Sequence, residues 1–177
     1  ETLTAFLTNT LAERFRRAVW AQNDAVSLAA IELQSDTKAG PLEGRMEHNI
    51  VATVGTQAAA ISLAQTTLNN ERFSLIHYEN CENTASQLAA VIGGIRTAIE
   101  GSTPGANTGP NCKFDDVELP WIKPQRHIAD RPSRGAQQTA LDNGVSPLKT
   151  SNSKAVFVRS ITTKSRQGVV PFYGTLD

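Results

Sequence analysis

"HNIVATVGT" (48–56) is the stretch that decides the fold of this chain. Small and β-branched apolar residues follow one another here between polar ends, which is typical of a strand buried on both faces of a sheet. Thr56 stands where it can cap a following helix, "QAAAISLAQTTLNN" (57–70). Four apolar residues share one face of that helix: Ala60, Ile61, Ala64 and Leu68. The stretch therefore predicts a buried strand that leads directly into a helix.

The same alternation repeats downstream. "RFSLIHYEN" (72–80) is a second strand candidate, and Asn83 or Thr84 can start a longer helix after it. The apolar residues of this helix recur at helical spacing: Leu88, Val91, Ile92, Ile95 and Ile99. Strand, helix, strand and helix with short connections predict an α/β fold, in which a mixed, mainly parallel sheet has right-handed crossovers and helices packed on it.

Two helices are expected before the first of these strands. Residues 1–17 carry apolar residues four apart: Leu3, Leu7, Leu11 and Phe15. After Asn23 and Asp24, residues that favour turns and helix N-caps, a second helix should run from Ala25 to about Asp36. Its expected apolar face has helical spacing: Val26, Ala29, Ala30 and Leu33. "KAGPLEG" (38–44) ends this helix.

The second half of the chain reads differently. The Gly-, Pro- and Asn-rich segment 101–117 is predicted to be a surface loop, and "ELPWIKP" (118–124) an extended stretch anchored by Trp121. A helix is expected over 131–143, ended by Gly144 in a left-handed conformation. "VSPLKT" and "KAVFVRSITT" then flank the polar turn "SNS" (151–153), which predicts a C-terminal antiparallel hairpin.

The length and the charge of the chain limit the number of domains and the kinds of partner to expect. The 177 residues suit one domain, divided into an alternating helix and strand core (1–100), a loop and Pro-rich segment (101–124), and a helix, hairpin and exit strand (125–177). Lys plus Arg and Asp plus Glu number 17 each, so no net field favours nucleic acid or anionic lipid. Since the chain opens on Glu1 and ends on the extended pattern "FYGTLD", we expect both ends to be cuts in a longer polypeptide.

The sequence holds no recognisable catalytic or phosphate-binding motif. Gly55 stands alone after its strand, so no G-x-G-x-x-G presents backbone amides to a phosphate. His48 and His77 both flank predicted strands and could meet at one sheet end with Asp24 or Glu79 as a metal or acid–base site. Surface or structural histidines are the favoured interpretation, because no paired spacing fixes two ligands on one face.

The two cysteines, Cys81 and Cys112, are far apart, which favours free thiols over a disulfide. Cys81 lies between a strand and a helix, a position that could lower its thiol pKa. Arg72 and Arg159 each stand at a strand end beside turn residues. Each arginine either pairs within the domain or contacts a neighbouring subunit, and the residues alone leave both possibilities open.

One block of the chain resembles a known family. "ALDNGVSPLKTSNSKAVFVRSITT" (140–163) is similar to a recurring element of the contractile-tail sheath proteins of bacteriophages, in which a helix ends on Asn-Gly and a later strand closes on Arg, a small residue, Ile, Thr, Thr. "GRMEHNIVATVG" (44–55), "AAISLAQTTLNNERFSLIHYEN" (59–80) and "SQLAAVIGGIRTA" (86–98) resemble that family's alternating pattern less specifically. Members normally carry further strands, arms and outer domains, so the chain looks like a central fragment of a sheath subunit.

The resemblance implies a structural subunit without catalysis, cofactor or metal. Such subunits polymerise as stacked hexameric rings around a tail tube and contract to drive the tube through the host envelope. The implied partners are other sheath subunits, the tail tube protein and the baseplate, with neither nucleic acid nor membrane insertion. The implied location is the virion tail, after assembly in the host bacterial cytoplasm. The isolated fragment should be mostly monomeric, unless faces of its core associate.

Four residues are candidates for the strand exit or for subunit contact: Arg72, Arg159, Thr162 and Thr163. The alternative function is an α/β enzyme or small-ligand-binding domain, with a site at the strand ends near Gly55, Glu79 and Cys81. An adaptor or tail terminator with a similar sheet is a third possibility.

Overall fold

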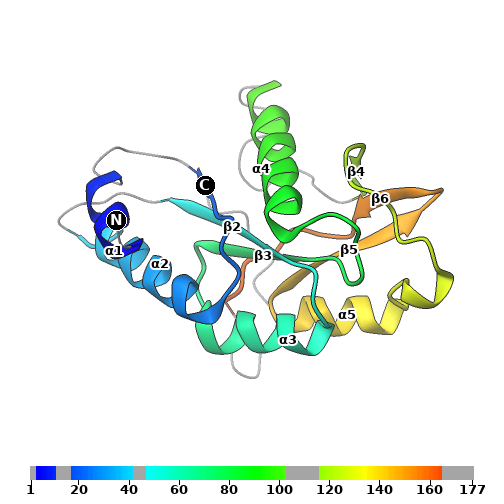
Figure 1. The fold of residues 1–177 in the computed structure, drawn as a ribbon, viewed down its shortest axis with the longest axis horizontal. Coiled ribbons are helices and arrows are strands. Elements are labelled where there is room, and N and C mark those ends of the chain that lie inside the picture. Colours follow the sequence, from blue (N-terminus) through cyan, green and yellow to red (C-terminus); the bar gives the residue numbers. More distant parts are fainter. Residues whose placement is uncertain (1–2, 11–16, 42–46, 103–115, 165–177) are drawn as a thin grey trace.

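The chain forms a six-stranded sheet with helices on both faces (Figure 1). The computed structural model describes residues 3–10, 17–41, 47–102 and 116–164. In spatial order the strands are β1 (Arg17–Val19), β2 (His48–Thr53), β3 (Phe73–His77), β5 (Val145–Ser151), β6 (Lys154–Phe157) and β4 (Glu118–Leu119). The pairs β1–β2, β2–β3 and β3–β5 are parallel, whereas β5–β6 and β6–β4 are antiparallel. The predicted mixed, mainly parallel α/β sheet with a C-terminal hairpin is confirmed.

Both faces of the central strands are buried, as their continuous apolar sequences predict. In β2, Ile50 and Ala52 pack into one core cluster and Val51 into the other. In β3, Leu75 and Ile76 divide between the two clusters in the same way. Two cores on opposite faces of one sheet therefore hold the helices in place.

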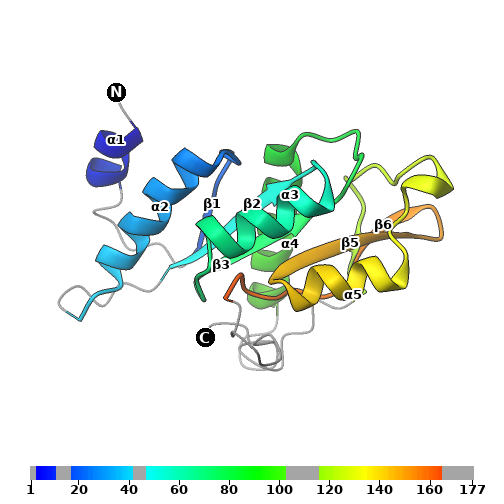
Figure 2. The same cartoon turned by 90° about the horizontal axis from the view of Figure 1, so that it is seen from below.

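One face of the sheet carries α2 (Ala25–Lys38), α3 (Gln57–Ser62) with its π-helical continuation η1 (Leu63–Thr67), and α5 (Arg134–Asp142), with α1 (Leu3–Thr10) packed beside α2. The long α4 (Ala85–Ser102) crosses the other face (Figures 1 and 2). Asp24 and Thr56 cap their helices as predicted. Thr84 and Gln87 form a reciprocal capping box at the start of α4.

The prediction of which apolar face of α2 packs on the sheet is wrong. The buried residues of this helix are Leu28, Ile31, Ser35 and Lys38, whereas Val26 is 84% exposed and Leu33 69% exposed. Two apolar stripes run along α2, and the sheet lies on the side of Leu28 and Ile31. Helical spacing identifies both stripes, but it does not say which one meets the sheet.

Two expectations about the middle segment also need correction. Trp121 is 70% exposed and is no anchor; Leu119 and Ile122 are buried in its place. After the short β4 the chain turns at Pro120 and Trp121, where Ile122 N–H donates to the Leu119 carbonyl at 3.1 Å, and this turn leaves Trp121 on the solvent side. Gly101 and Ser102 belong to α4 and not to the predicted loop. Residues 103–115 of that loop, including Cys112, lie outside the described residues, as do Leu11 and Phe15 of the first predicted helix.

The C-terminal hairpin closes through a two-residue turn. Asn152 and Ser153 have φ values of 49° and 59°, and Ser151 pairs with Lys154 across the turn. Positive φ at both central residues gives the backbone twist that matches two antiparallel strands. Gly144, with φ of 78°, ends α5 as predicted.

The two adjacent glycines of α4 make a matched test of its close approach to β1. A Cβ on Gly93 would collide with the Val19 side chain, whereas a Cβ on Gly94 would meet nothing within 4 Å. We expect Gly93→Ala to lower the free energy of unfolding by about 1–2 kcal/mol through overpacking. Gly94→Ala should raise it by about 0.5–1 kcal/mol, because alanine favours helix. Urea denaturation measures both; equal effects would contradict the close packing of α4 on β1.

Candidate functional site

The candidate site is the segment by which the chain leaves the hairpin, residues 158–163, here called the exit segment. It crosses the edge of the sheet where β3 and β5 begin, called the amino edge. Val158 N–H donates to the Pro147 carbonyl of β5 at 3.1 Å, and Thr163 N–H donates to the Phe73 carbonyl of β3 at 2.8 Å. The exit segment thus passes from β5 to β3.

Two buried serines hold the centre of the exit segment. The hydroxyls of Ser74 and Ser146 donate to the Ile161 carbonyl at 3.0 and 3.1 Å. Ile161 N–H donates to the Ser146 hydroxyl at 2.9 Å. Ser74 lies on β3 and Ser146 on β5. Side chains of two neighbouring strands therefore satisfy the Ile161 backbone, which a buried non-strand segment requires.

Thr163 fixes the end of the exit segment. Its hydroxyl shares one hydrogen between the carbonyls of Leu68 at 2.7 Å and Asn70 at 2.9 Å, and it accepts from Asn70 N–H at 3.2 Å. The residue is fully buried. A single side chain therefore ties the C-terminal end of the described fold to the loop that precedes β3. Gly144 permits this close approach, because a Cβ there would lie 2.8 Å from the Thr163 carbonyl oxygen.

Thr162 differs from its neighbour. It is also buried, at 2% exposure, yet within the described part of the chain its hydroxyl has no hydrogen-bond partner. Burial of an unsatisfied hydroxyl costs stability. The two adjacent threonines thus have opposite energetic roles.

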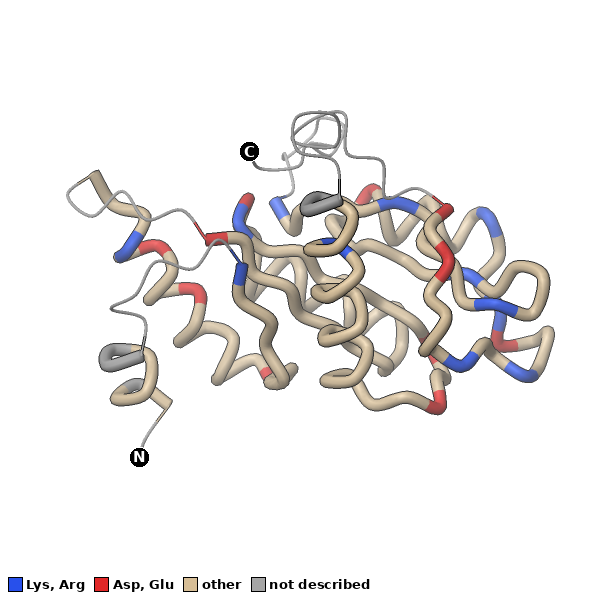
Figure 3. Tube along the Cα trace, turned by 90° about the horizontal axis from the view of Figure 1, so that it is seen from above, with Lys and Arg blue, Asp and Glu red and all other residues tan. Residues whose placement is uncertain are grey.

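Arg72 pairs inside the domain. Its Nη1 lies 2.6 Å from Asp36 Oδ1, and its backbone N–H donates to Asn70 Oδ1 at 3.0 Å. Asn70 Nδ2 also donates to Asp36 Oδ1 and Glu32 Oε1, at 2.8 and 3.2 Å. These residues line an open polar groove of about 400 Å³ that Lys164 borders. Along the described chain, positions of acidic and basic residues are interspersed (Figure 3).

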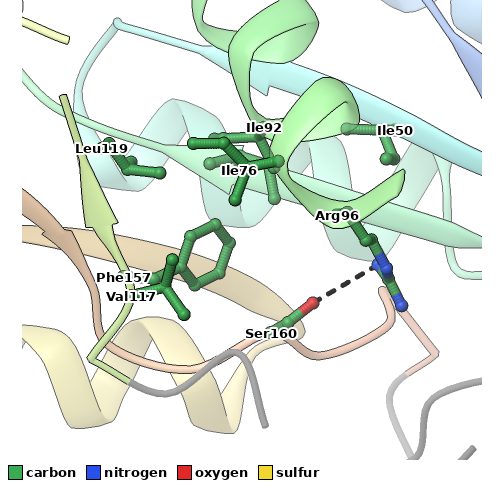
Figure 4. A pocket seen from close by; sticks show the side chains of 9 residues that line it. Ile50, Ile76, Ile92, Arg96, Val117, Leu119, Phe157 and Ser160 are labelled. Carbon is green, nitrogen blue, oxygen red and sulfur yellow. Dashed lines mark hydrogen bonds between the residues drawn. The ribbon is translucent and has the colours of Figure 1, made fainter. Parts of the chain in front are cut away.

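A buried charged cluster lies next to the exit segment. Arg96 of α4 is 5% exposed; its Nη1 donates to His48 Nε2 at 2.9 Å and to the Ser160 hydroxyl at 3.5 Å (Figure 4). Burial lowers the pKa of His48 well below its ordinary value of 6.5, and the positive charges of Arg96 and Arg17 lower it further. His48 is therefore neutral, with its proton on Nδ1, since Nε2 accepts from Arg96.

The space beside this cluster is narrow and apolar. Arg96 and Ser160 stand at one end of a pocket of about 10 Å³, which is room for roughly one water molecule. The other lining residues are apolar: Ile50, Ile76, Ile92, Ile95, Val117, Leu119 and Phe157 (Figure 4). A small-molecule site needs roughly 300 Å³ or more, so this pocket is a packing gap.

The opposite, carboxyl edge of the strands carries the residues of the alternative function. There His77 Nε2 donates to the Gly55 carbonyl at 2.8 Å, and Gln125 Nε2 donates to the Glu79 carbonyl at 2.6 Å. Neither the polar groove nor the apolar pocket includes Gly55, Glu79 or Cys81. The Gly55 and Glu79 carbonyls at this edge thus accept hydrogen bonds from side chains of the same chain, and these bonds hold the loops over the strand ends.

The structure decides against two possibilities that the sequence left open. His48 and His77 do not meet, because β2 and β3 are parallel and His48 stands at the start of β2 while His77 ends β3. Burial raises the pKa of the Cys81 thiol, whose sulfur accepts from Asn83 N–H at 3.3 Å, so the position between a strand and a helix does not lower that pKa. Among the residues with a described placement, no three His, Cys, Asp or Glu side chains gather to hold a metal ion.

The structure brings two of the four candidate residues together. Thr163 and Arg72 both bond to Asn70, whereas Arg159 is exposed on the exit segment and Thr162 is buried. Sequence reasoning missed the residues that hold the segment: Ser74, Ser146, Asn70 and Arg96. A signal existed for Arg96, which is the only charged residue between Glu82 and Glu100 in a helix otherwise apolar on its buried side.

No protein-family model matches the sequence, and no curated protein matches it either. Two crystal structures are similar in fold. A sheath tail protein from Desulfitobacterium hafniense superposes with a TM-score of 0.62 at 16% identity, over 90% of this chain and 34% of that one. A sheath tail protein from Listeria innocua gives a TM-score of 0.63 at 14% identity, over 93% and 34%. The chain thus has the fold of about one third of these proteins.

The adjacent threonines give a matched pair of substitutions. Thr163→Val leaves the Leu68 and Asn70 backbone groups buried without their partner, so we expect it to lower the free energy of unfolding by about 2–3 kcal/mol. Thr162→Val removes an unsatisfied hydroxyl of the same shape and should be neutral or raise stability by up to about 1 kcal/mol. Chemical denaturation of both variants measures the difference. A loss of stability in Thr162→Val as large as in Thr163→Val would contradict the assigned bonds.

The neutral state of His48 predicts a pH dependence. Its folded-state pKa lies below the 6.5 of an ordinary histidine, so the unfolded chain binds the proton first as the pH falls. Stability should therefore decline from about pH 6.5 downward, until the folded pKa is reached. His48→Gln, which can still accept from Arg96, should reduce this slope between about pH 5 and 6.5.

The pKa of His77 is also lowered by burial, so the wild-type slope contains a second contribution, which the variant retains. Urea unfolding across this pH range separates the two. An identical pH slope in the wild type and in His48→Gln would show that His48 is not buried in its neutral form.

Proposed function

We propose that this chain is part of a structural subunit of a contractile phage tail sheath. The full subunit would polymerise in stacked hexameric rings around a tail tube and contract to drive the tube through the host envelope. Its partners would be other sheath subunits, the tail tube protein and the baseplate. It would assemble in the bacterial cytoplasm and reside in the virion tail.

The observation that carries this proposal is the fold likeness to two sheath tail proteins over at least 90% of the chain. A shared fold alone does not fix a function. The block at residues 140–163 adds weight, because its resemblance to sheath sequences includes the exit segment, which bonds to β3, to β5 and to the loop before β3. The chain spans about one third of those proteins, which agrees with a role as one unit of a larger subunit.

The bonds of the exit segment fit a role in transmitting force between the sheet and the rest of the subunit. The backbone or side chains of Ile161 and Thr163 bond to β3, to β5 and to the loop before β3. A pull on residue 163 would therefore load several bonds together and spread over two neighbouring strands. A closely packed two-sided core resists deformation under such a load. The work of contraction would come from contacts between subunits, with no part for catalysis.

Within the exit segment, Arg159 is the candidate contact with a neighbouring subunit, because its side chain is exposed while Ile161, Thr162 and Thr163 are buried. The buried residues would anchor the segment, and Arg159, at its exposed position, would bond to a carboxylate of another subunit. Arg72, paired with Asp36, would stiffen the loop that Thr163 holds.

The test is to express the complete open reading frame from which this chain derives and to view it by negative-stain electron microscopy. Long hollow sleeves of stacked rings are expected. Arg159→Ala in that product should shorten or abolish the sleeves while the domain stays folded, which thermal unfolding checks. Arg134→Ala, at an exposed position on α5, is the matched control and should assemble normally.

Discrete monomers or dimers from the complete product would overturn the sheath proposal. Sleeves of normal length from the Arg159→Ala product would instead reject only the contact assigned to Arg159. Separate readouts therefore test the assembly and the residue.

A further inference from the structure

Asn143 is the only asparagine in the sequence that a glycine follows. The backbone nitrogen after an asparagine can attack the side-chain amide carbon, and Gly144 has no side chain to hinder that approach. The attack joins Gly144 N to Asn143 Cγ in a succinimide ring, and the side-chain nitrogen leaves as ammonia with the proton that Gly144 N loses. Water then opens the ring at either carbonyl and leaves aspartate or isoaspartate. In an unfolded chain this asparagine is therefore the one most open to deamidation.

The fold holds both reacting groups away from each other. Asn143 Nδ2 donates to the Thr139 carbonyl at 2.7 Å, and Asn143 Oδ1 accepts from Gln65 Nε2 of η1. Gly144 N–H donates to the Leu141 carbonyl at 3.1 Å. The amide side chain is thus bonded at both ends, and the nitrogen that would attack it is bonded to the last turn of α5.

The exit segment blocks the rotation that would close the ring. The ψ angle of Asn143 is 18°, and a turn about this bond that brings the nitrogen toward Cγ must carry Gly144 with it. Gly144 is buried against Thr163, where a Cβ would lie 2.8 Å from the carbonyl oxygen and 3.1 Å from Cα. Either the end of α5 opens or the exit segment moves before the ring can form.

We propose that Asn143 is a deamidation site that the folded chain keeps closed and that local opening at the end of α5 makes reactive. The reactive state has lost the bonds to Thr139, Gln65 and Leu141. The deamidation rate is then the rate of the unfolded chain multiplied by the fraction of time that this end is open. The site does not depend on the proposed sheath role, because it needs only the described chain.

The modification would weaken the anchor of the exit segment. In isoaspartate the backbone runs through Cβ, so an additional carbon atom enters the chain directly before Gly144, which has no free space against Thr163. Both products also replace the Nδ2 donor to Thr139 with a carboxylate at the C-terminal end of α5. The helix dipole disfavours negative charge there. A single chemical change at Asn143 therefore acts on Thr163, 20 residues further along the chain.

The first experiment compares the deamidation rates of the folded and the denatured chain. Both are held at mildly alkaline pH, one in buffer and one in concentrated guanidinium chloride, and samples are digested with trypsin. Asn143 is the only asparagine in the tryptic peptide 135–149, so the mass gain of that peptide reports this site. We expect the folded chain to react at least about tenfold more slowly. Equal rates under the two conditions would overturn the proposal.

A substitution at Gln65 tests the closed state directly. Gln65→Ala removes the bond to Asn143 Oδ1 at an exposed position. It should raise the rate in buffer about threefold and leave the rate in guanidinium chloride unchanged, because the bond exists only in the folded chain. The matched control is Gln138→Ala, also at an exposed position, whose side chain bonds to Asp142 and which should react like the wild type. An unchanged rate in Gln65→Ala would reject the closing role of this bond.

The second experiment measures the exit segment after modification. The chain is aged in guanidinium chloride until peptide 135–149 is mostly isoaspartyl, and it is then refolded. Exchange of the Thr163 N–H, which donates to the Phe73 carbonyl, is followed by nuclear magnetic resonance. It should be at least about tenfold faster than in the unaged chain. Unchanged exchange in the refolded isoaspartyl chain would overturn the link between Asn143 and the exit segment.

Two variants of Asn143 separate the causes. Asn143→Asp has the carboxylate with a normal backbone, so its Thr163 N–H should exchange faster than in the wild type and more slowly than in the isoaspartyl chain. Asn143→Gln, aged in the same way, controls for changes at other asparagines, because its longer side chain does not form the succinimide ring. A modified chain that no longer refolds, beside an aged Asn143→Gln chain that does, would support the same link.

Discussion

The parallel pairing of β2 with β3 is the constraint on which the rest of this structure depends. Every residue of both strands is buried, so each strand needs a covering layer on both sides. That requirement places α2, α3 and α5 on one face and α4 on the other. It also requires a cover for the strand ends, which loops provide at the carboxyl edge and the exit segment provides at the amino edge. The polar groups gathered at these edges serve to close the sheet.

Much of the fold could be predicted from the sequence because its signals are local. A continuous apolar run such as Ile50–Ala52 specifies a strand buried on both sides, and caps such as Thr56 and Asp24 mark where helices start. The features that the sequence did not predict depend on which side of an element faces the core. α2 has two apolar stripes, and helical spacing ranks neither of them above the other. The size of Trp121 suggests an anchor, whereas its position next to the short β4 decides its exposure.

The candidate site was predictable only in part, for a related reason. The pattern around residues 159–163 marks a strand exit, but the groups that hold it lie far away in the sequence. Serines inside strands, such as Ser74 and Ser146, look like ordinary strand residues until two strands become neighbours. A pairing of His48 with His77 assumes that the two strand ends converge. In parallel strands a start and an end lie at opposite edges, so only knowledge of the register separates them.

The bond between Thr163 and the Leu68 carbonyl joins residues 95 positions apart. A contact at such a separation forms late, because a long loop must close before it contributes. During synthesis, β2, β3 and the helices around them are complete well before residue 163 leaves the ribosome. The amino edge of the sheet therefore stays uncovered until the exit segment has been synthesised. Until then the nascent protein exposes the starts of its most apolar strands, and this is the period in which it most needs protection from aggregation.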